Sequence, residues 1–423
     1  MAEALARHVP PASSLVLALS GGLDSVVLLH LLAALRAQHP FVFAAVHVHH
    51  GLSPHADSWA DFCTRLCAAH AVPLTIARVQ VDCADPAGIE ATARRERQRV
   101  FAQVEADFLL TAHHQDDQAE TFLLQALRGA GPKGLAAMPV CQDRPGMHAA
   151  QLRPLLDVPR TVLKAYAQAA NLEWVEDDSN ADRRYRRNAL RLDVMPPLAA
   201  HFPGAAATLA RAASLQADAA DLLDDLARLD AVDALAGARL ECAALARLTP
   251  PRARNLLRHF IALHGARLPA MRRLDEILKQ LCEARTDARV RVELDAAEIR
   301  RYRGGAYVVP RCARPEPAVW QGGNALVLPG LGTLQLRETR GEGLRAATLQ
   351  TGQTRLQVRA GGEHLRLAAG GSTRSLKTLM QERAMPPWAR ERVAVLRLDA
   401  AVLWVAGFGC NADWLAGEGE AGW

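Results

Sequence analysis

The chain has 423 residues with 50 basic and 45 acidic side chains, which gives a formal net charge of +5. Half of the residues are hydrophobic. This composition predicts about two to four globular domains of roughly 100–200 residues each. It excludes a disulfide miniprotein, a coiled coil and a disordered tail protein. So small a basic excess does not by itself indicate a nucleic-acid binder.

The first ten residues hold neither a basic segment nor a long apolar run, and no stretch of roughly 18 apolar residues lacks charge. We therefore expect no membrane span and a cytoplasmic location. The eight cysteines form no CxxC pair, so free thiols are expected rather than disulfides.

Apolar, strand-like runs alternate with helical patterns in the first half of the chain. Runs such as LVLALS and FVFAAV are apolar on both faces, as strands inside a parallel sheet are. The predicted strands are Leu15–Ser20, Phe41–His50, Leu74–Val81, Phe108–His114 and Gln151–Leu156. The predicted helices lie near 25–38, 57–70, 90–105, 116–128 and 159–170. The alternation predicts an α/β domain over 1–200 with a doubly wound, mostly parallel sheet.

After Pro196 and Pro197 the pattern changes. Helical patterns at 205–231, 251–264 and 269–284, then a β-branched segment with Gly304-Gly305 as its turn, predict a mainly helical domain over 205–310 that ends in a hairpin. Residues 311–325 contain Pro and Gly and predict a linker. Strand-like segments at 325–328, 332–337, 355–359, 364–367 and 402–407, with a helix at 375–383, predict a small β-rich domain over 325–423.

The strongest local motif is LALSGGLDSVVLL, residues 17–29. A buried strand ends in Ser20, Gly21, Gly22, Leu23, Asp24 and Ser25, and an apolar helix follows at once. The two glycines allow a sharp turn and a close approach to a ligand, and the helix N-terminus favours an anion. The motif predicts a phosphate-binding loop. It matches neither GxxxxGK[ST] nor GxGxxG, which excludes the usual kinase-type and dinucleotide sites.

A second segment, TAHHQDDQAET (111–121), lies where the fourth strand passes into a helix, at the same edge of the sheet. Asp117 and Glu120 are three residues apart and share one face of that helix. Two carboxylates beside a triphosphate can hold Mg²⁺ or an ammonium group. The alternative is an acidic helix start that complements the helix dipole, which alone would explain Asp116 and Asp117.

Two further segments carry polar side chains. His47, His49 and His50 end the second strand; with no Cys or carboxylate at finger spacing, they favour a polar wall of a nucleotide cleft over a zinc site. In the helix after Ile89, Arg94 and Arg97 share one face. Arg95 and Arg99 share another face. One of these two faces can reach a polyphosphate, and the other is a solvated surface.

Read together, these motifs resemble a known enzyme family. SGGLDS is similar to the pyrophosphate loop of the N-type ATP pyrophosphatases. HVHHGLS, TAHHQDDQAET, RGAGPKGL (128–135), RPLL (153–156), WVEDDSNADRRYRRNALRLDVMP (174–196) and LKTLMQERAMPPWARERV (376–393) follow it in order. The combination resembles the tRNA(Ile)-lysidine synthetases, most closely over 15–200 and least over 201–370.

The resemblance implies ATP-dependent ligation of free L-lysine to C2 of the wobble cytidine in tRNA(Ile) with a CAU anticodon. It implies that Ser20, Gly21, Gly22 and Ser25, in the loop that also holds Leu23, bind the pyrophosphate of ATP. Asp24 would bind Mg²⁺ or lysine, and Asp117 and Glu120 would bind the lysine amines or Mg²⁺. Arg97, less favourably Arg94, would contact the α-phosphate or the lysine carboxylate, and His113 would line the adenylation site. A homodimer is compatible with the resemblance, although the sequence does not give the oligomeric state.

Two arginine-rich segments are candidate RNA contacts. One holds Arg183, Arg184, Arg186, Arg187 and Arg191, after Glu176-Asp177-Asp178. In the family such a segment approaches the anticodon; the alternative is a helix with a charged outer face. The other surrounds the turn at Pro386-Pro387-Trp388 and holds Arg374, Lys377, Arg390 and Arg392.

Two competing functions use the same loop. A thiolating tRNA enzyme would need a catalytic cysteine or a CxxC pair, and neither is evident, although Cys63 and Cys67 are not excluded. An RNA-binding protein with an inactive nucleotide site is disfavoured by the intact loop.

The net charge is unevenly distributed. Residues 1–200 hold 19 basic and 21 acidic side chains, a net of −2, and 201–249 hold 4 and 7, a net of −3. Residues 250–313 hold 14 and 7, a net of +7, and 314–423 hold 13 and 10, a net of +3. The distribution predicts chemistry in the first half and RNA binding in the second.

Overall fold

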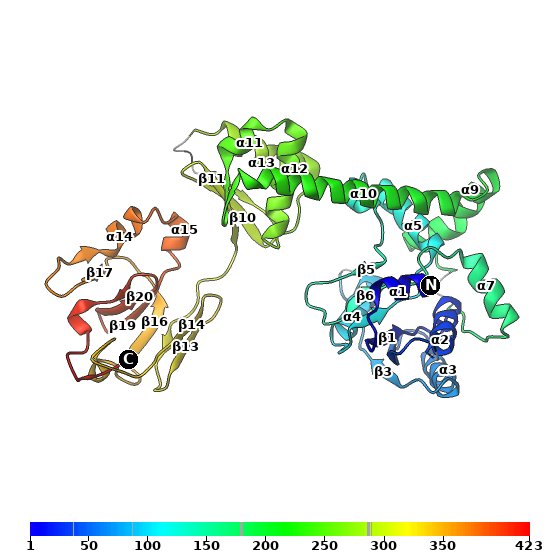
Figure 1. Ribbon diagram of the computed structural model, residues 1–423, viewed down its shortest axis with the longest axis horizontal. Coiled ribbons are helices and arrows are strands. Elements are labelled where there is room, and N and C mark those ends of the chain that lie inside the picture. The colour runs from blue at the N-terminus through cyan, green and yellow to red at the C-terminus, as the bar shows by residue number, and fades with distance from the viewer. Residues whose placement is uncertain (37, 87, 178–180, 286–287, 289) are drawn as a thin grey trace. The chain divides into compact units, whose positions relative to one another are not determined.

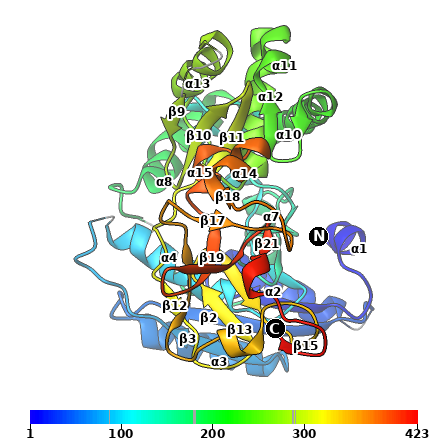
Figure 2. The same ribbon diagram turned by 90° about the vertical axis from the view of Figure 1, so that its left-hand side faces the viewer.

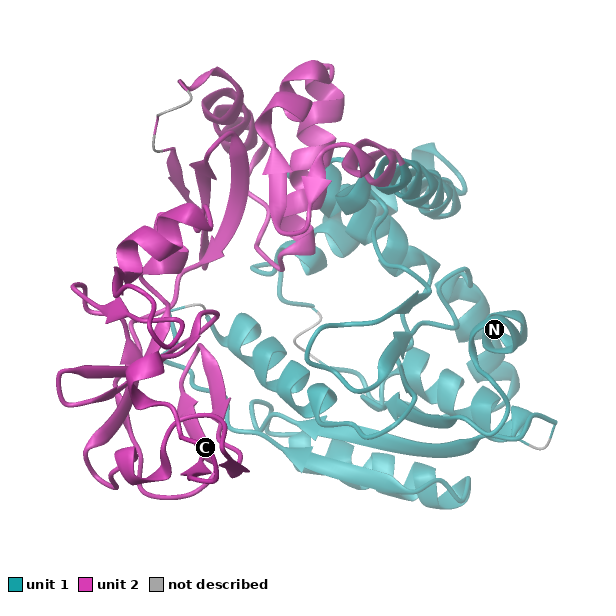
Figure 3. Ribbon diagram, turned by 60° about the vertical axis from the view of Figure 1, so that its left-hand side comes forward, with its two compact units in different colours: residues 1–225 teal, residues 226–423 magenta. Residues whose placement is uncertain are grey.

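The computed structural model describes residues 1–36, 38–86, 88–177, 181–285, 288 and 290–423. The chain divides into two compact units, residues 1–225 and 226–423, which are described separately (Figure 3). The boundary falls within the long helix α10 (Ala205–Val232). The three-domain division is finer than these units and stays a prediction. Within the described ranges, no helix combines the length and apolarity needed to cross a membrane.

Unit 1 is built on a six-stranded sheet in the order β3-β2-β1-β4-β6-β5 (Figure 1). Its strands are β1 Ser14–Ala18, β2 Val42–His49, β3 Leu74–Arg78, β4 Phe108–Leu110, β5 Cys141–Gln142 and β6 Ala150–Leu152. All neighbours are parallel except the short β5, which the sequence did not predict. The predicted parallel-dominated sheet is confirmed. Each predicted strand ends early, and after β1 and β4 the residues already belong to the segments that carry the candidate site.

Helices cover both faces of this sheet. Leu15 and Leu17 of β1 belong to one core with α2, α3 and α7, whereas Val46 and Leu109 share a second core with Phe101 of α4. The helices of the unit are α1 Ala2–His8, α2 Leu23–Leu35, α3 Ala56–Ala69, α4 Ile89–Ala102, α5 Gln115–Ala126, α6 Pro132–Leu135, α7 Arg160–Ala169, α8 Arg186–Ala189, the π-helix η2 Leu190–Val194, α9 Met195–His201 and most of α10. Apolar side chains thus alternate between the two layers, as in a doubly wound fold.

The first part of unit 2 packs helices against an antiparallel sheet in the order β7-β8-β11-β10-β9 (Figure 2). The elements are β7 Leu235–Ala236, β8 Arg239–Glu241, α11 Cys242–Arg247, α12 Pro250–Leu263, α13 Met271–Glu283, β9 Arg291–Glu293, β10 Ala297–Tyr302 and β11 Gly305–Pro310. The predicted helices and hairpin are present, but β7 and β8 enlarge the hairpin into a sheet. The predicted turn at Gly304-Gly305 was wrong by one residue. Tyr302 pairs with Gly305, so Arg303 and Gly304, both with positive φ, form the two-residue turn.

The remainder of unit 2 is β-rich, as predicted. Its main sheet has the order β12-β16-β19-β20-β21. The elements are β12 Ala318–Val319, β13 Ala325–Leu328, β14 Gly332–Gln335, β15 Thr339–Arg340, η3 Ala346–Thr348, β16 Thr354–Val358, β17 His364–Leu365, β18 Arg374–Ser375, α14 Leu376–Glu382, α15 Pro387–Arg390, β19 Ala394–Leu398, β20 Ala401–Val405, β21 Gly409–Cys410, η4 Ala412–Trp414 and β22 Ala421–Gly422. The predicted linker at 311–325 needs correction, because β12 pairs with β16 and Trp320 is buried in the core beside it.

Candidate active site

The loop between β1 and α2 has the geometry of a phosphate cradle. Gly21 has φ +85°, and a Cβ there would lie 3.0 Å from Val175 Cγ2 and 3.1 Å from Cys63 Sγ, so glycine is required. Ser25 Oγ donates to the Gly22 carbonyl at 2.9 Å and lies 3.0 Å from Ser20 Oγ. Gly22 caps α2 without a side-chain bond, which leaves the first amide groups of the helix open to an anion.

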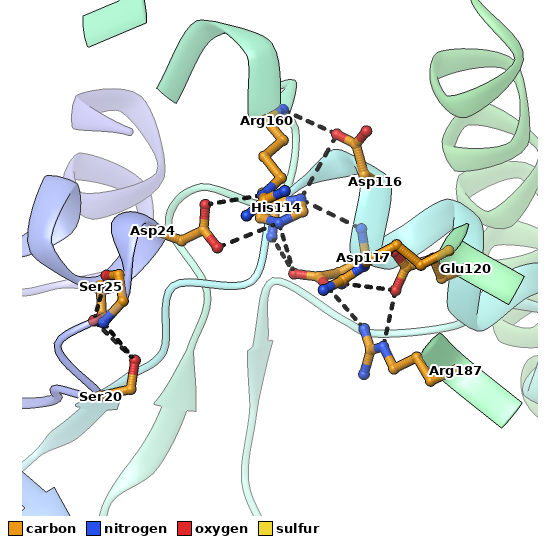
Figure 4. A network of polar contacts seen from close by, with 11 residues as sticks. Ser20, Asp24, Ser25, His114, Asp116, Asp117, Glu120, Arg160 and Arg187 are labelled. Atoms are coloured by element: carbon orange, nitrogen blue, oxygen red, sulfur yellow. Dashed lines mark hydrogen bonds and ion pairs between the residues drawn. The ribbon is translucent and has the colours of Figure 1, made fainter. Parts of the chain in front are cut away.

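His114 joins this loop to the acidic start of α5 (Figure 4). The His114 amide donates to Asp117 Oδ2 at 3.1 Å, and the Asp117 amide donates to His114 Nδ1 at 3.4 Å. This reciprocal cap leaves the proton on Nε2, which lies 3.6 Å from Asp24 Oδ2 and 3.4 Å from Asp117 Oδ2. Burial would lower the pKa of His114, but the nearby carboxylates of Asp24, Asp117 and Asp116 raise it. The histidine therefore bridges two acidic residues from the first turns of different helices, α2 and α5.

Asp117 and Glu120 are buried and paired with two arginines from a distant segment. Arg187 donates from Nη2 to Asp117 Oδ1 and from Nε to Glu120 Oε2, both at 2.9 Å. Arg191 donates from Nη2 to Asp117 Oδ1 at 3.1 Å and from Nε to Glu120 Oε1 at 2.6 Å. Burial would raise the pKa of Asp117, but His114 and Arg187 lower it. The cluster, as Figure 4 shows for Arg187, balances two carboxylates against two guanidinium groups.

Asp24 differs from this paired cluster. Its Oδ1 is buried and has no hydrogen-bond partner in the described part of the chain. Arg160 Nε lies 3.7 Å from that oxygen, at ion-pair distance, while the Arg160 amide donates to Asp116 Oδ2 at 2.9 Å. Asp116 thus accepts a hydrogen bond from the first residue of α7, a contact that the sequence did not predict. An orphaned carboxylate oxygen beside a phosphate cradle fits Mg²⁺, which commonly binds one or two carboxylates together with substrate phosphates.

Arg97 lies on the inner face of α4, and the other arginines of this helix face solvent. The exposed Arg95 and Arg99 pair with Asp85 and Glu96. Burial lowers the pKa of Arg97, and Arg94 and Arg187 lower it further. No hydrogen bond or ion pair to another described residue neutralises the Arg97 guanidinium. A half-buried, unpaired guanidinium near the cluster is suited to bind an anionic substrate group.

Residues 2–198 match a family model described as a PP-loop domain, 240–307 match a TilS substrate binding domain, and 354–423 match a TilS substrate C-terminal domain. The chain is 46% identical over 420 residues to a tRNA(Ile)-lysidine synthase of Azoarcus sp. (strain BH72), covering 99% of this chain and 92% of that protein. The chain belongs to the tRNA(Ile)-lysidine synthase family.

Other members of the family are similarly close. The tRNA(Ile)-lysidine synthase of Aromatoleum aromaticum is 44% identical over 421 residues, covering 99% of this chain and 98% of that protein. That of Nitrosomonas europaea is 40% identical over 423 residues, covering 99% and 92%. A solved U34-tRNA thiolase from Methanococcus maripaludis covers 48% of this chain and 72% of its own, with 21% identity and a TM-score of 0.41. The family resemblance read from the motifs is confirmed, and with it an ATP-using, tRNA-binding ligase.

The sequence did not indicate every residue of the candidate site, and it assigned some of them to a different role from the one that their contacts suggest. His114 and Arg160 received no role. Arg187 and Arg191 were grouped with an RNA-facing cluster, but they pair with Asp117 and Glu120. The available signal was that Arg187 and Arg191, four residues apart, and Asp117 and Glu120, three residues apart, are each spaced by about one helical turn. Arg183 and Arg184 instead pair with Asp193 and Asp182. Of the EDDSN motif, residues 178–180 lie outside the described residues.

Unit 2 of this chain contains a cavity of its own. A cavity of about 730 Å³ is lined by Trp388 and by the arginines Arg300, Arg311, Arg314, Arg359 and Arg392. Trp388 packs edge-on against Tyr302 and Tyr307, and the Arg300 guanidinium lies 5.5 Å from the centre of its ring. The buried Glu298 carboxylate pairs with Arg300 and with Arg291. Positive charge therefore exceeds negative charge along this wall.

Proposed function

We propose that this chain joins the ε-amine of free L-lysine to C2 of the wobble cytidine in tRNA(Ile) with a CAU anticodon, at the expense of ATP. The observation that carries the proposal is His114, which lies between Asp24 of the phosphate loop and Asp117 of the buried charged cluster. Phosphate binding and zwitterion binding thus meet at one edge of the sheet. Family membership supplies the nucleic-acid substrate.

The reaction has two displacement steps. The cytidine O2 attacks the α-phosphate of ATP, the α–β phosphoanhydride bond breaks, and pyrophosphate leaves. The lysine ε-amine, in its neutral form, then attacks C2 of the adenylated base. The C2–O2 bond breaks, AMP leaves with that oxygen, and the amine proton is lost. Neither step needs a covalent enzyme intermediate, so positioning and charge stabilisation carry the catalysis.

The loop residues Ser20, Gly21, Gly22, Leu23 and Ser25 bind the pyrophosphate half of ATP. Support comes from the open amide groups at the start of α2 and from the absence of a Cβ at Gly21. Asp24, whose Oδ1 accepts no hydrogen bond from a described residue, would hold Mg²⁺. When bound, the ion supplies charge neutralisation of the phosphate oxygens. Asp117 was the other candidate ligand, but both of its oxygens already have partners.

Asp117 and Glu120 bind the ammonium groups of lysine, and Arg187 or Arg191 binds its carboxylate. Two carboxylates and two guanidinium groups complement an amino acid that carries one carboxylate and two amines. Because these protein groups now satisfy one another, lysine would bind by exchange of partners. Exchange keeps every buried charge compensated, which avoids the desolvation penalty of an unpaired ion.

Arg97 contacts the α-phosphate of ATP, and His113 lines the adenylation site. Arg97 is the better candidate than Arg94, because Arg94 is exposed whereas Arg97 is partly buried near Arg187. An unpaired guanidinium near the α-phosphate would stabilise the charge that develops during adenylation.

The arginine-lined cavity of unit 2 contacts the tRNA. Arginines bind phosphate oxygens, and Trp388 offers an aromatic face next to them. Within this proposal the chain acts in the cytoplasm, and a homodimer remains an expectation that light scattering can test.

One assay separates the candidate functions. Purified protein is mixed with ATP, Mg²⁺, labelled lysine and tRNA from a strain that lacks lysidine. The proposal expects lysine-labelled tRNA together with AMP and pyrophosphate. Thiolated tRNA without lysine would establish the competing enzyme, and tRNA binding without any product would establish an inactive nucleotide site.

A further inference from the structure

A buried arginine that has no carboxylate partner among the described residues is connected by hydrogen bonds to the candidate site residue His113. Arg153 follows β6 and is only 2% exposed. It donates from Nη1 to the Pro139 carbonyl at 2.6 Å and from Nη2 to Gln151 Oε1 at 2.7 Å. No ion pair joins it to a described acidic residue, and its Nε has no partner there. Burying an unpaired guanidinium is costly, so its position calls for a functional explanation.

The hydrogen bonds of Arg153 continue to His113 through two more buried side chains. Gln151 Nε2 donates to Thr111 Oγ1 at 3.2 Å. Thr111 Oγ1 in turn lies 2.9 Å from His113 Nδ1. The path exists because β4 and β6 are adjacent and parallel, and the Thr111 amide extends their ladder by donating to the Leu152 carbonyl at 3.0 Å.

The direction of each hydrogen bond follows from the donor capacity of Arg153. Burial lowers its pKa to about 10, so the guanidinium remains charged at neutral pH and can only donate. Gln151 must therefore present its oxygen to Arg153 and its NH₂ group to Thr111. Thr111 Oγ1 accepts that bond from Gln151. The Thr111 hydroxyl then donates its proton to His113 Nδ1, which is the acceptor available to it among the described residues.

We propose that Arg153, Gln151 and Thr111 are positioning residues that hold His113 as a neutral imidazole with its proton on Nε2. His113 then donates a hydrogen bond from Nε2 to an oxygen of the substrates at the adenylation centre. The hydrogen bond to substrate rests on the proposed function, whereas the tautomer of His113 is a property of the free protein. No described residue accepts a hydrogen bond from His113 Nε2, so this donor is available to a ligand.

The charges around His113 agree with this assignment. Burial lowers the pKa of His113 to about 4; Asp117 opposes the shift, and Arg153 and Arg187 reinforce it. A neutral imidazole donor stabilises developing negative charge without releasing its proton.

The substitution Gln151→Glu tests the relay with almost no change in shape. A glutamate accepts from Arg153 and also from Thr111, which reverses the bond between residues 151 and 111. Thr111 Oγ1 can then only accept from His113, so the His113 proton moves to Nδ1. Long-range ¹H–¹⁵N correlation spectra of protein labelled at histidine nitrogens separate the two tautomers, and His113→Asn assigns the signal.

We expect a single Nε2–H tautomer in the unsubstituted protein and a protonated Nδ1 in Gln151→Glu. With one donor lost at the reacting centre, kcat for lysine ligation should fall about 100-fold, while tRNA affinity stays within about twofold. A wild-type proton on Nδ1, or an unchanged Nε2–H tautomer in Gln151→Glu, overturns the proposal. If Gln151→Glu does not fold, Thr111→Val takes its place: it removes the hydrogen bond to Nδ1, so an unchanged tautomer population together with an unchanged kcat there overturns the proposal.

Two controls separate the relay from general effects. Thr111→Ser keeps the hydroxyl and should keep both the tautomer and kcat. Gln118→Glu places a buried carboxylate on α5, where Gln118 contacts the backbone of Met138 rather than the relay. Gln118→Glu should lower stability and leave the His113 proton on Nε2. If the proton moves to Nδ1 in Gln118→Glu, the added charge controls the tautomer, and the proposed dependence on the direction of the hydrogen bonds is wrong. The spectra need no substrate, so they test the relay even if no ligation is observed.

Discussion

Arg187 Nε donates to Glu120 Oε2 at 2.9 Å although 67 residues of sequence separate the two. The contact joins the helix that follows β4 to the segment that precedes α10. With Arg191 and Asp117 it forms a charged cluster in which each carboxylate accepts from both guanidinium groups. The same groups are the proposed lysine site, so stability and substrate binding draw on one set of interactions.

Glu120→Gln should weaken both the stability of the fold and the binding of lysine. Breaking a wholly buried pair costs about 3–5 kcal/mol, but the Arg187 and Arg191 side chains are 33% and 30% exposed, so we expect about 1–3 kcal/mol in urea unfolding. KM for lysine should rise at least about tenfold. Glu3→Gln, in an exposed pair with Arg7, serves as control and should change stability by less than about 0.5 kcal/mol. Unchanged KM and stability in Glu120→Gln would contradict the assignment.

Asp24→Ala should abolish lysine incorporation while tRNA binding persists, because the orphaned Oδ1 is the proposed contact to Mg²⁺. Labelled-lysine incorporation and filter binding of tRNA measure the two effects. Glu3→Ala, which removes an exposed carboxylate paired with Arg7, should retain activity. Near-normal incorporation by Asp24→Ala would exclude a role in catalysis.

Gly21→Ala and Gly51→Ala separate backbone strain from crowding. Both glycines have positive φ, but a Cβ at Gly51 meets nothing within 4 Å, whereas one at Gly21 meets Val175 and Cys63. We expect Gly51→Ala to cost about 1 kcal/mol of stability and Gly21→Ala to cost more. Gly21→Ala alone should also raise KM for ATP. Equal effects of the two substitutions would show that close packing at the loop is unimportant.

His113 should make stability fall as pH falls from 6.5 to about 4. Its pKa in the folded chain is about 4 and its ordinary value is 6.5, so between these values the unfolded chain binds more protons. Stability therefore rises with pH across this window, with a slope of at most about 1.4 kcal/mol per pH unit. Below about pH 4 the contribution of His113 to the free energy of unfolding is fully lost. Chemical unfolding at several pH values should show a shallower slope in His113→Gln, and an identical slope would rule out a depressed pKa.

Arg392→Ala should weaken tRNA binding in a salt-dependent manner. Losing one phosphate contact should lower the slope of log K against log salt by about 1. Arg7→Ala removes an exposed guanidinium from α1 in unit 1, and should leave that slope unchanged. Equal slopes for the two variants would place the cavity outside the tRNA footprint.

The sequence alone determined the features that depend on neighbouring residues. Alternating apolar runs predicted the parallel sheet of unit 1, since burial on both faces leaves a local pattern. SGGLDS predicted the turn between β1 and α2, because positive φ and open amide groups are properties of a few consecutive residues. The ordered motifs were sufficient to indicate the family. Local periodicity also found α10, α12 and α13, but it missed β7 and β8, whose stability depends on pairing with β11.

Tertiary structure decided which charged groups meet. Helical spacing placed Asp117 and Glu120 on one face, yet it could not show that Arg187 and Arg191 neutralise them, because that contact depends on how a distant segment packs. The relay from Arg153 to His113 likewise depends on β4 and β6 being neighbours. Bond direction, tautomer and the orphaned oxygen of Asp24 follow from burial, which removes water as an alternative partner. Burial is a property of the folded chain, so these chemical states appear only when the three-dimensional structure is known.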